Sequence, residues 1–232
     1  MRGLSEHYPD DIEAQIFYAL SLLANLDPSD SKHRRALEAE SILNPLFHRY
    51  ERHPGIAHYL IHALDYPELA ERGLPAARVY SEIAPFSAHA LHMPSHIFTR
   101  LGHWRASIDT NIKSANASRK KASAGAAINF HAQGYLAYAY LQIDDEQRAK
   151  AILNEVARES RVRDGRVLAE LPARWSLERR DWNAASDVQS SAIVEDGWPR
   201  AEVLAIIPFA RGLGAARSGK LSQAREEIQK LK

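Results

Sequence analysis

Four segments of this chain repeat the same arrangement of a turn followed by a helix, and this repetition constrains the fold more than any other feature. The segments are RLGHWRASIDTNIKSA (100–115), QIDDEQRAKAILNEVA (142–157), ERRDWNAASDVQSSAI (178–193) and ARSGKLSQAREEIQKL (216–231). A small residue lies seven positions before each turn and another lies five positions after the turn begins. The pairs are Ser95 and Ser107, Ala137 and Ala149, Ala173 and Ala185, and Gly212 and Ala224. Small side chains let two helices approach closely, so the pattern predicts a series of helix hairpins.

Apolar residues follow a helical period through almost the whole chain, and alternating patterns typical of strands are absent. The predicted helices include residues 13–26 and 32–50, the second interrupted near Pro45. Short breaks between helices favour antiparallel neighbours. We therefore predict one all-α domain over residues 1–232, an α-solenoid or superhelix of antiparallel helix hairpins. It comprises a divergent N-terminal hairpin (1–53), histidine-rich repeats (54–121) and C-terminal repeats (126–232).

Composition narrows the chemistry that such a fold can carry. The net charge is +1, so no global charge favours nucleic acid or a membrane surface, and we predict neither as a partner. The chain contains no cysteine, which excludes disulfides and thiolate metal sites. Any metal must therefore be held by His, Asp or Glu. As it stands the sequence predicts a cytoplasmic protein, or an exported one if it is part of a longer chain. It does not predict an oligomeric state.

Histidines gather in one part of the chain. Of 11 histidines, six lie between residues 53 and 96. They include two sets with helical spacing, one in HPGIAHYLIHALD (53–65) and one in HALHMPSHIF (89–98). Residues three, four or seven positions apart share one face of a helix. If helices open at Pro54 and Ala88, which are 34 residues apart, His58 and His92 both occupy the fifth position. His62 and His96 then both occupy the ninth.

The repeat resembles the tetratricopeptide repeat, whose period is about 34 residues. Gly102 and Trp104 match its turn best, whereas Asp144 and Arg180 stand where the turn usually has glycine. The phrases HPGIAHYLIHALDYP, LAERGLPAARVYSEIAP, HALHMPSHIFTRLGHW and QGYLAYAYLQ further resemble a bacterial, histidine-rich subfamily of this repeat, over about residues 9–142. That resemblance implies a site but no particular reaction.

Resemblance to the tetratricopeptide repeat also implies a concave groove. Its lining residues occupy positions 2, 5, 9, 12 and 13 of the first helix in each hairpin. A helix opening at Phe130 and another at Arg166 extend this register along the chain. The groove residues expected on this basis are His58, His62, Asp65, His89, His92, His96, Arg100, His131, Glu170 and Arg174.

A transition-metal site is one hypothesis for the histidines. Neutral imidazole is the commonest protein ligand for such metals, and two histidines at i and i+4 can chelate one ion. The candidate ligands are His58, His62, Asp65, His89, His92 and His96. Asp65 either completes the ligand set or accepts a hydrogen bond from a metal-binding histidine and so fixes the orientation of its ring. Zinc is the preferred ion, with iron, nickel or copper as alternatives. Pro94 leaves open whether His92 and His96 lie on one continuous helix.

Other hypotheses stay open beside the metal site. A metal-free groove could bind a peptide, a protein or a small anion through Tyr59, Arg100, His131, Glu170 and Arg174. The histidines could also be mainly structural. If a metal is present, the protein is either a binding scaffold or a metal-dependent hydrolase or oxygenase. The zincin arrangement is excluded, because no glutamate lies between His58 and His62.

Overall fold

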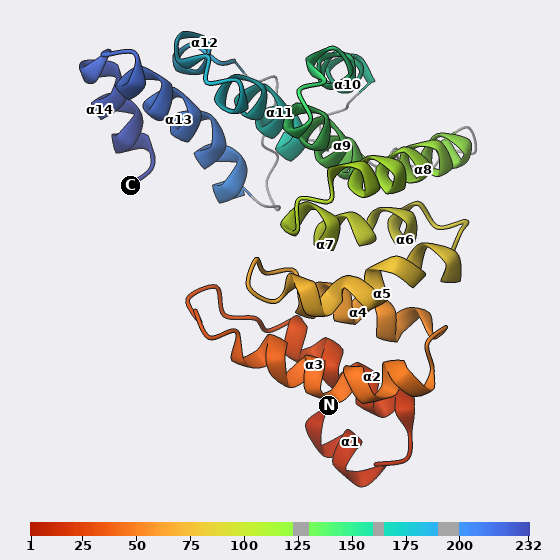
Figure 1. Ribbon diagram of the computed structural model, residues 1–232. Helices are drawn as coiled ribbons and strands as arrows, with labels where there is room; N and C mark the ends of the chain where they lie inside the picture. Colours follow the sequence, from red (N-terminus) through yellow and green to blue (C-terminus); the bar gives the residue numbers. More distant parts are fainter. Residues whose placement is uncertain (123–129, 160–164, 190–199) are drawn as a thin grey trace. The chain divides into compact units, whose positions relative to one another are not determined.

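The computed structural model describes residues 1–122, 130–159, 165–189 and 200–232, and in these residues the only regular secondary structure is helical (Figure 1). The chain divides into two compact units, Met1–Ile128 and Asn129–Lys232. The all-α prediction is confirmed for the described residues. A single continuous domain stays a prediction. Among the described helices, none is both long and apolar enough to cross a membrane.

The first unit contains α1 (Arg2–His7), α2 (Ile12–Leu23), α3 (Arg34–Arg49), α4 (Pro54–Ala63), α5 (Ala70–Ile83), α6 (Ala88–His92), α7 (Pro94–Arg100) and α8 (Trp104–Ala122). Each helix from α1 to α5 packs against the next one, α5 packs against α7, and both α6 and α7 pack against α8. The two short helices α6 and α7 thus take the place of one longer helix. The core of the first unit includes Leu43, Ile56, Ile61, Leu64, Met93 and Ile97, all fully buried.

The second unit contains α9 (Phe130–Gln142), α10 (Glu146–Glu159), α11 (Gly165–Glu178), α12 (Trp182–Ser186), α13 (Arg200–Arg217) and α14 (Leu221–Lys230). Each described helix of this unit packs against the next one, and the short α12 thus contacts both α11 and α13. In addition, α9 packs against α11 and α11 packs against α13. The second unit is thus held together by contacts between neighbouring helices and between alternate helices.

A left-handed residue forms the turn in four hairpins, as the repeated segments predict. The residues are Gly102, Asp144, Arg180 and Gly219, with φ of 70°, 59°, 54° and 78°. In each turn the following amide donates to a carbonyl five residues earlier, for example His103 to Phe98 and Asp181 to Ser176. This bond is the one that closes a helix in the Schellman motif. Asp144 and Arg180 therefore do occupy the glycine position of the turn.

Small residues mark the close contacts between helices. The seven described alanines and serines among the predicted pairs are all buried, at 5% exposure or less. A Cβ on Gly212 would lie 3.4 Å from the Cβ of Glu227, so this glycine also faces a neighbouring helix. Gly73 on α5 is tighter still, because a Cβ there would lie 2.8 Å from Ile97 Cδ1 on α7. The separation of α5 and α7 thus depends on a missing side chain.

Local signals set the helix starts around the histidines. Pro54 occupies the first turn of α4, and the His53 side chain accepts a hydrogen bond from the amide of Ile56. Ser87 caps α6 in the same way by accepting from the amide of Ala90. The first amides of a helix have no partner within it. A proline, which has no amide hydrogen, and a side chain that accepts from such an amide therefore both favour a helix start. The predicted starts at Pro54 and Ala88 are confirmed.

Pro94 interrupts the hydrogen bonding but not the direction of the helix. Met93 between α6 and α7 keeps right-handed helical angles, φ −50° and ψ −40°. The His96 amide donates to the Met93 carbonyl across this junction. His92 and His96 therefore remain on one face, as they would on a continuous helix.

Arg180 provides a test of the repeated turn. Its side chain is exposed, and its backbone adopts a conformation that costs an L-residue about 1 kcal/mol. We expect Arg180→Gly to raise the free energy of unfolding by about 1 kcal/mol, measured by chemical denaturation. Gly219→Ala is the matched control and should lower that free energy by a similar amount. A destabilised Arg180→Gly variant would contradict this account of the turn.

Candidate metal centre

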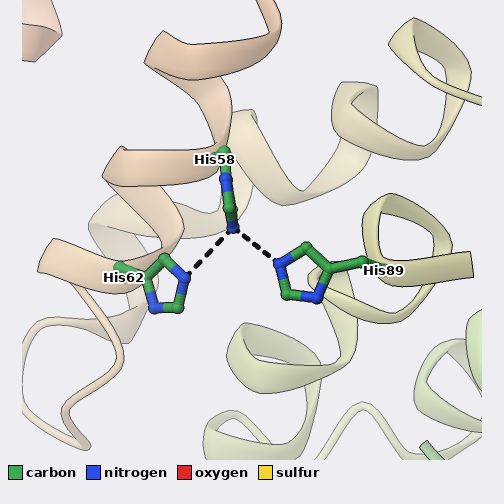
Figure 2. A group of neighbouring side chains, drawn as sticks. All are labelled: His58, His62 and His89. Carbon is green, nitrogen blue, oxygen red and sulfur yellow. Dashed lines mark hydrogen bonds between the residues drawn. The ribbon is translucent and has the colours of Figure 1, made fainter. Parts of the chain in front are cut away.

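Three histidines from two hairpins bring their Nε2 atoms together (Figure 2). His58 and His62 lie one turn apart on α4, and His89 lies on α6. His58 Nε2 is 3.1 Å from His62 Nε2 and 2.9 Å from His89 Nε2. All three ligand atoms lie within 4.8 Å of one another. We call these residues the His58 triad, and their arrangement is one that could hold a metal ion.

A single proton cannot satisfy these contacts. A neutral imidazole offers one donor nitrogen and one acceptor nitrogen, and each Nε2 carries either a proton or a lone pair. His58 Nε2 faces two other Nε2 atoms at hydrogen-bonding distance, so one of the two contacts always lacks a well-placed proton or lone pair. Imidazole nitrogens bound to one zinc ion lie about 2.0–2.1 Å from it, hence about 3.3 Å from each other in a tetrahedral arrangement. The two separations from His58 lie within a few tenths of an ångström of that spacing.

Aromatic rings hold His58 in place. The Tyr80 ring on α5 stacks on His58 with centroids 5.4 Å apart and an interplanar angle of 9°. Tyr59 lies beside the same imidazole at 5.2 Å, so the predicted groove residue Tyr59 does adjoin the site. His58 is half-buried, whereas His62 and His89 are exposed. The triad is therefore fixed on its inner side and open to solvent on its outer side.

The environment keeps the triad neutral. Burial, followed by repulsion from His62, His89 and His96, lowers the pKa of His58 to about 3. Partial burial and then His96 lower the pKa of His62 to about 4. The pKa of His89 is also lowered, first by burial and then by His96. Neutral imidazole is the form that binds metals, so protons compete little for these ligands near neutral pH.

Two further histidines form a second group beside the triad. His92 on α6 and His96 on α7 place their Nε2 atoms 3.1 Å apart, and we call them the His92 pair. The His62 and His96 rings lie 6.3 Å apart, so the pair adjoins the triad. His92 is 1% exposed and His96 is partly buried. The i, i+4 geometry that Pro94 left open is present in the structure.

Asp65 supports His96 rather than pointing into the triad. Its Oδ2 lies 2.8 Å from His96 Nδ1, and its Oδ1 accepts a hydrogen bond of 2.8 Å from Arg100 Nε. Burial raises the pKa of this carboxyl, but the hydrogen bonds and charges of His96 and Arg100 outweigh burial and leave it lowered. Asp65 is therefore an ionised acceptor behind a histidine, the arrangement that orients metal-binding imidazoles in many proteins. Arg100 is engaged with this carboxylate.

Asn111 belongs to the same region and was not predicted. Its Oδ1 lies 2.7 Å from His92 Nδ1, and its Nδ2 donates to the Ser107 carbonyl at 2.8 Å. The sequence does contain a signal for it. Ser107, Asn111, Ser114 and Ser118 recur every three or four residues along α8 and are all buried. A polar stripe on the buried face of an amphipathic helix indicates hydrogen-bonding partners there.

The remaining predicted groove residues lie in the second unit. His131 on α9 is exposed and meets Tyr135 edge-on, with ring centroids 5.1 Å apart. Glu170 and Arg174 on α11 pair with each other at 2.7 Å, and Arg174 also lies over the Tyr138 ring at 4.3 Å. Both line a pocket of about 480 Å³ with Ala173, Leu177, Ile206 and Phe209. Their role in ligand binding stays a prediction.

Two comparisons with known proteins were made. No model of a known protein family matches the chain, and a search of curated proteins finds no significant match.

The lowered pKa values of His58 and His62 predict how pH affects the stability of the metal-free protein. His58 and His62 titrate near 3 and 4 when folded and near 6.5 when unfolded. Between these values the unfolded chain binds protons that the folded chain does not, so the free energy of unfolding falls as pH drops from about 6.5 to about 4. We expect this fall, measured by denaturation in the presence of a chelator, to be shallower in His58→Gln/His62→Gln.

A control variant separates these histidines from the others. His48 is exposed on α3, outside both groups, so His48→Gln should keep the slope of the parent protein. Equal slopes for the parent protein and the double variant would show that the two histidines are not kept neutral by the fold.

Proposed function

We propose that this protein is a scaffold of tetratricopeptide-like hairpins that holds a divalent transition-metal ion at the His58 triad. The observation that carries the proposal is the convergence of three Nε2 atoms, with separations of 2.9 and 3.1 Å from His58. The ion would supply an open coordination position at the exposed side of the triad. A peptide, a protein or a small anion would bind there.

Support for a repeat scaffold comes from the turns and the packing together. The same left-handed turn closes four hairpins, and alternate helices contact each other in both units. Stacked hairpins present extended surfaces to partners, which is how repeat proteins commonly bind. The likeness to the tetratricopeptide repeat in particular rests on the residue pattern of these turns.

Zinc is the ion that the donor set suits best. The three donors are imidazole nitrogens, which bind zinc, copper, nickel and iron. Softer sulfur donors would favour copper(I), but the chain has no cysteine and Met93 lies in the apolar core at 1% exposure. Zinc accepts three histidines and one further ligand without a demanding geometry.

Binding of an anionic partner would depend on the ion more than on the arginines. Arg100 is paired with Asp65, and Arg174 is paired with Glu170, both within 2.8 Å. These carboxylates neutralise the guanidinium charges that a free anion would need. A carboxylate or phosphate of the partner would instead fill the open position of the ion at the exposed edge formed by His62 and His89.

A metal-dependent hydrolase is the second candidate, and one observation favours it. The triad offers three protein ligands and is open to solvent on one side. Closed sites with four protein ligands are typical of structural zinc, whereas three ligands with an open position are typical of catalytic zinc. Bound there, the ion would lower the pKa of a water molecule and so supply a nucleophile. The substrate is not indicated by these residues.

Metal content tests the leading proposal. After incubation with excess zinc and buffer exchange, plasma mass spectrometry of the tag-free protein should find at least one equivalent retained. Zinc should also raise the melting temperature, because an ion that binds only the folded state at 100 times its Kd adds about 2.7 kcal/mol to stability. His58→Gln/His62→Gln should lose both effects, and His48→Gln should keep both. A folded parent protein without bound zinc, cobalt, nickel, copper or iron would overturn the proposal.

An exogenous anion tests whether the ion keeps an open position. Cobalt(II) replaces zinc and reports its coordination by visible absorption. We expect azide to shift the spectrum of the cobalt-loaded parent protein, because it would displace solvent from the exposed side of the triad. An unchanged spectrum at saturating azide would indicate a closed site and would exclude the hydrolase candidate.

A further inference from the structure

We propose that the His92 pair binds a second divalent ion, so that the five histidines of α4, α6 and α7 form a two-ion cluster. This inference rests on the proposed function, because it assumes that the neighbouring His58 triad holds the first ion. It goes beyond that function by assigning a separate site, with its own ligands and its own supporting residues.

Hydrogen bonding at the Nδ1 atoms determines what the Nε2 atoms carry. A carboxylate only accepts, so His96 Nδ1 must donate its proton to Asp65. The Asn111 amide nitrogen donates to Ser107, so its oxygen faces His92 and accepts from His92 Nδ1. In the neutral form, both histidines therefore direct an Nε2 lone pair toward each other across 3.1 Å. Two lone pairs at this distance repel unless a metal ion or a proton lies between them, and a divalent ion supplies the larger charge.

The pair and the triad do not fit around one ion. Two nitrogens bound to the same zinc lie at most about 4.2 Å apart, twice the bond length. The triad atoms all lie within 4.8 Å of one another, and the Nε2 atoms of His92 and His96 are outside that group. One ion at the triad therefore leaves the His92 pair without it. A second ion between His92 and His96 would use the geometry of two histidines at i and i+4.

The residues behind the pair form a connected support. Asp65 is fixed by Arg100 and fixes His96 in turn. Asn111 is fixed by Ser107 on the same helix and fixes His92. Such outer partners set the tautomer and the ring orientation of metal-binding histidines, and their loss typically weakens binding about 10–100-fold. His58 of the triad is held in a different way, by ring stacking with Tyr59 and Tyr80.

Repulsion between the ions separates the two binding steps, and the number of ligands at each site decides their order. Asp65 contacts the cluster but shares its charge with Arg100, so it would neutralise little of the repulsion between two divalent ions. We expect the triad, with three ligands, to fill first and the His92 pair to fill at a higher metal concentration. The measurement must therefore be made at equilibrium with free metal.

Equilibrium dialysis against cobalt(II), with metal and protein both quantified, tests this inference. The parent protein should bind two equivalents in two separable steps. His92→Gln/His96→Gln should bind one equivalent in the tighter step, and His58→Gln/His62→Gln should lose the tighter step. His48→Gln should match the parent protein and thereby accounts for adventitious binding to exposed histidines.

The outcomes separate the two proposals. One equivalent that is lost in His58→Gln/His62→Gln and unaffected in His92→Gln/His96→Gln would overturn the second site and leave the proposed function intact. One equivalent lost in both variants would indicate a single shared ion and would also overturn the second site. No bound metal in the parent protein would overturn both proposals.

Asp65→Asn provides a milder variant in case substitutions of the buried His92 prevent folding. An asparagine keeps the size of the side chain but removes the anionic acceptor behind His96. We expect the weaker step to shift to about 10–100-fold higher cobalt concentration while the tighter step stays unchanged. Glu68→Gln, which removes an exposed carboxylate paired with His33 instead, is the matched control and should change neither step. Equal shifts in both steps, or in neither, would count against the second site.

Discussion

The absence of a side chain at Gly73 sets the spacing on which the histidine cluster depends. Helix α5 lies between α4 and the α6–α7 segment, contacting both. A Cβ on Gly73 would lie 2.8 Å from Ile97 Cδ1 and 3.2 Å from Leu64 Cβ, so both neighbours are already at closest approach. Because α4 carries His58 and α6 carries His89, this packing decides whether their Nε2 atoms meet. Well-packed interiors deform little, so the spacing is a property of the core and not of the exposed histidines.

Much of this arrangement follows from sequence patterns because those patterns act locally. Pro54, with the His53 cap, and Ser87 determine where α4 and α6 begin, so the register of His58, His62 and His89 could be predicted from helical spacing. The left-handed turns at Asp144 and Arg180 could be predicted as well, because the repeat places them at the position that glycine occupies at 102 and 219. Local signals of this kind need no knowledge of what lies across the helix interface.

Other features depend on contacts between distant segments, which spacing does not reveal. Asp65 shares a helical stripe with His58 and His62 in the sequence, yet it lies beyond the end of α4 and contacts His96 and Arg100. Asn111 reaches His92 across 19 residues, and only the polar stripe along α8 hints at such a partner. Arg174 illustrates the same limit, because its pairing with Glu170 follows from helical spacing but its position over Tyr138 does not.

The triad joins residues 31 positions apart, from His58 on α4 to His89 on α6. An ion bound to all three imidazoles would therefore close a loop containing the whole of α5, as a covalent crosslink would. Closing such a loop removes conformational freedom from the unfolded chain and from partly opened states in which the hairpins separate. The metal would then act as a reversible crosslink between α4 and α6. The rigidity of residues 58–89 would increase with the concentration of free ion.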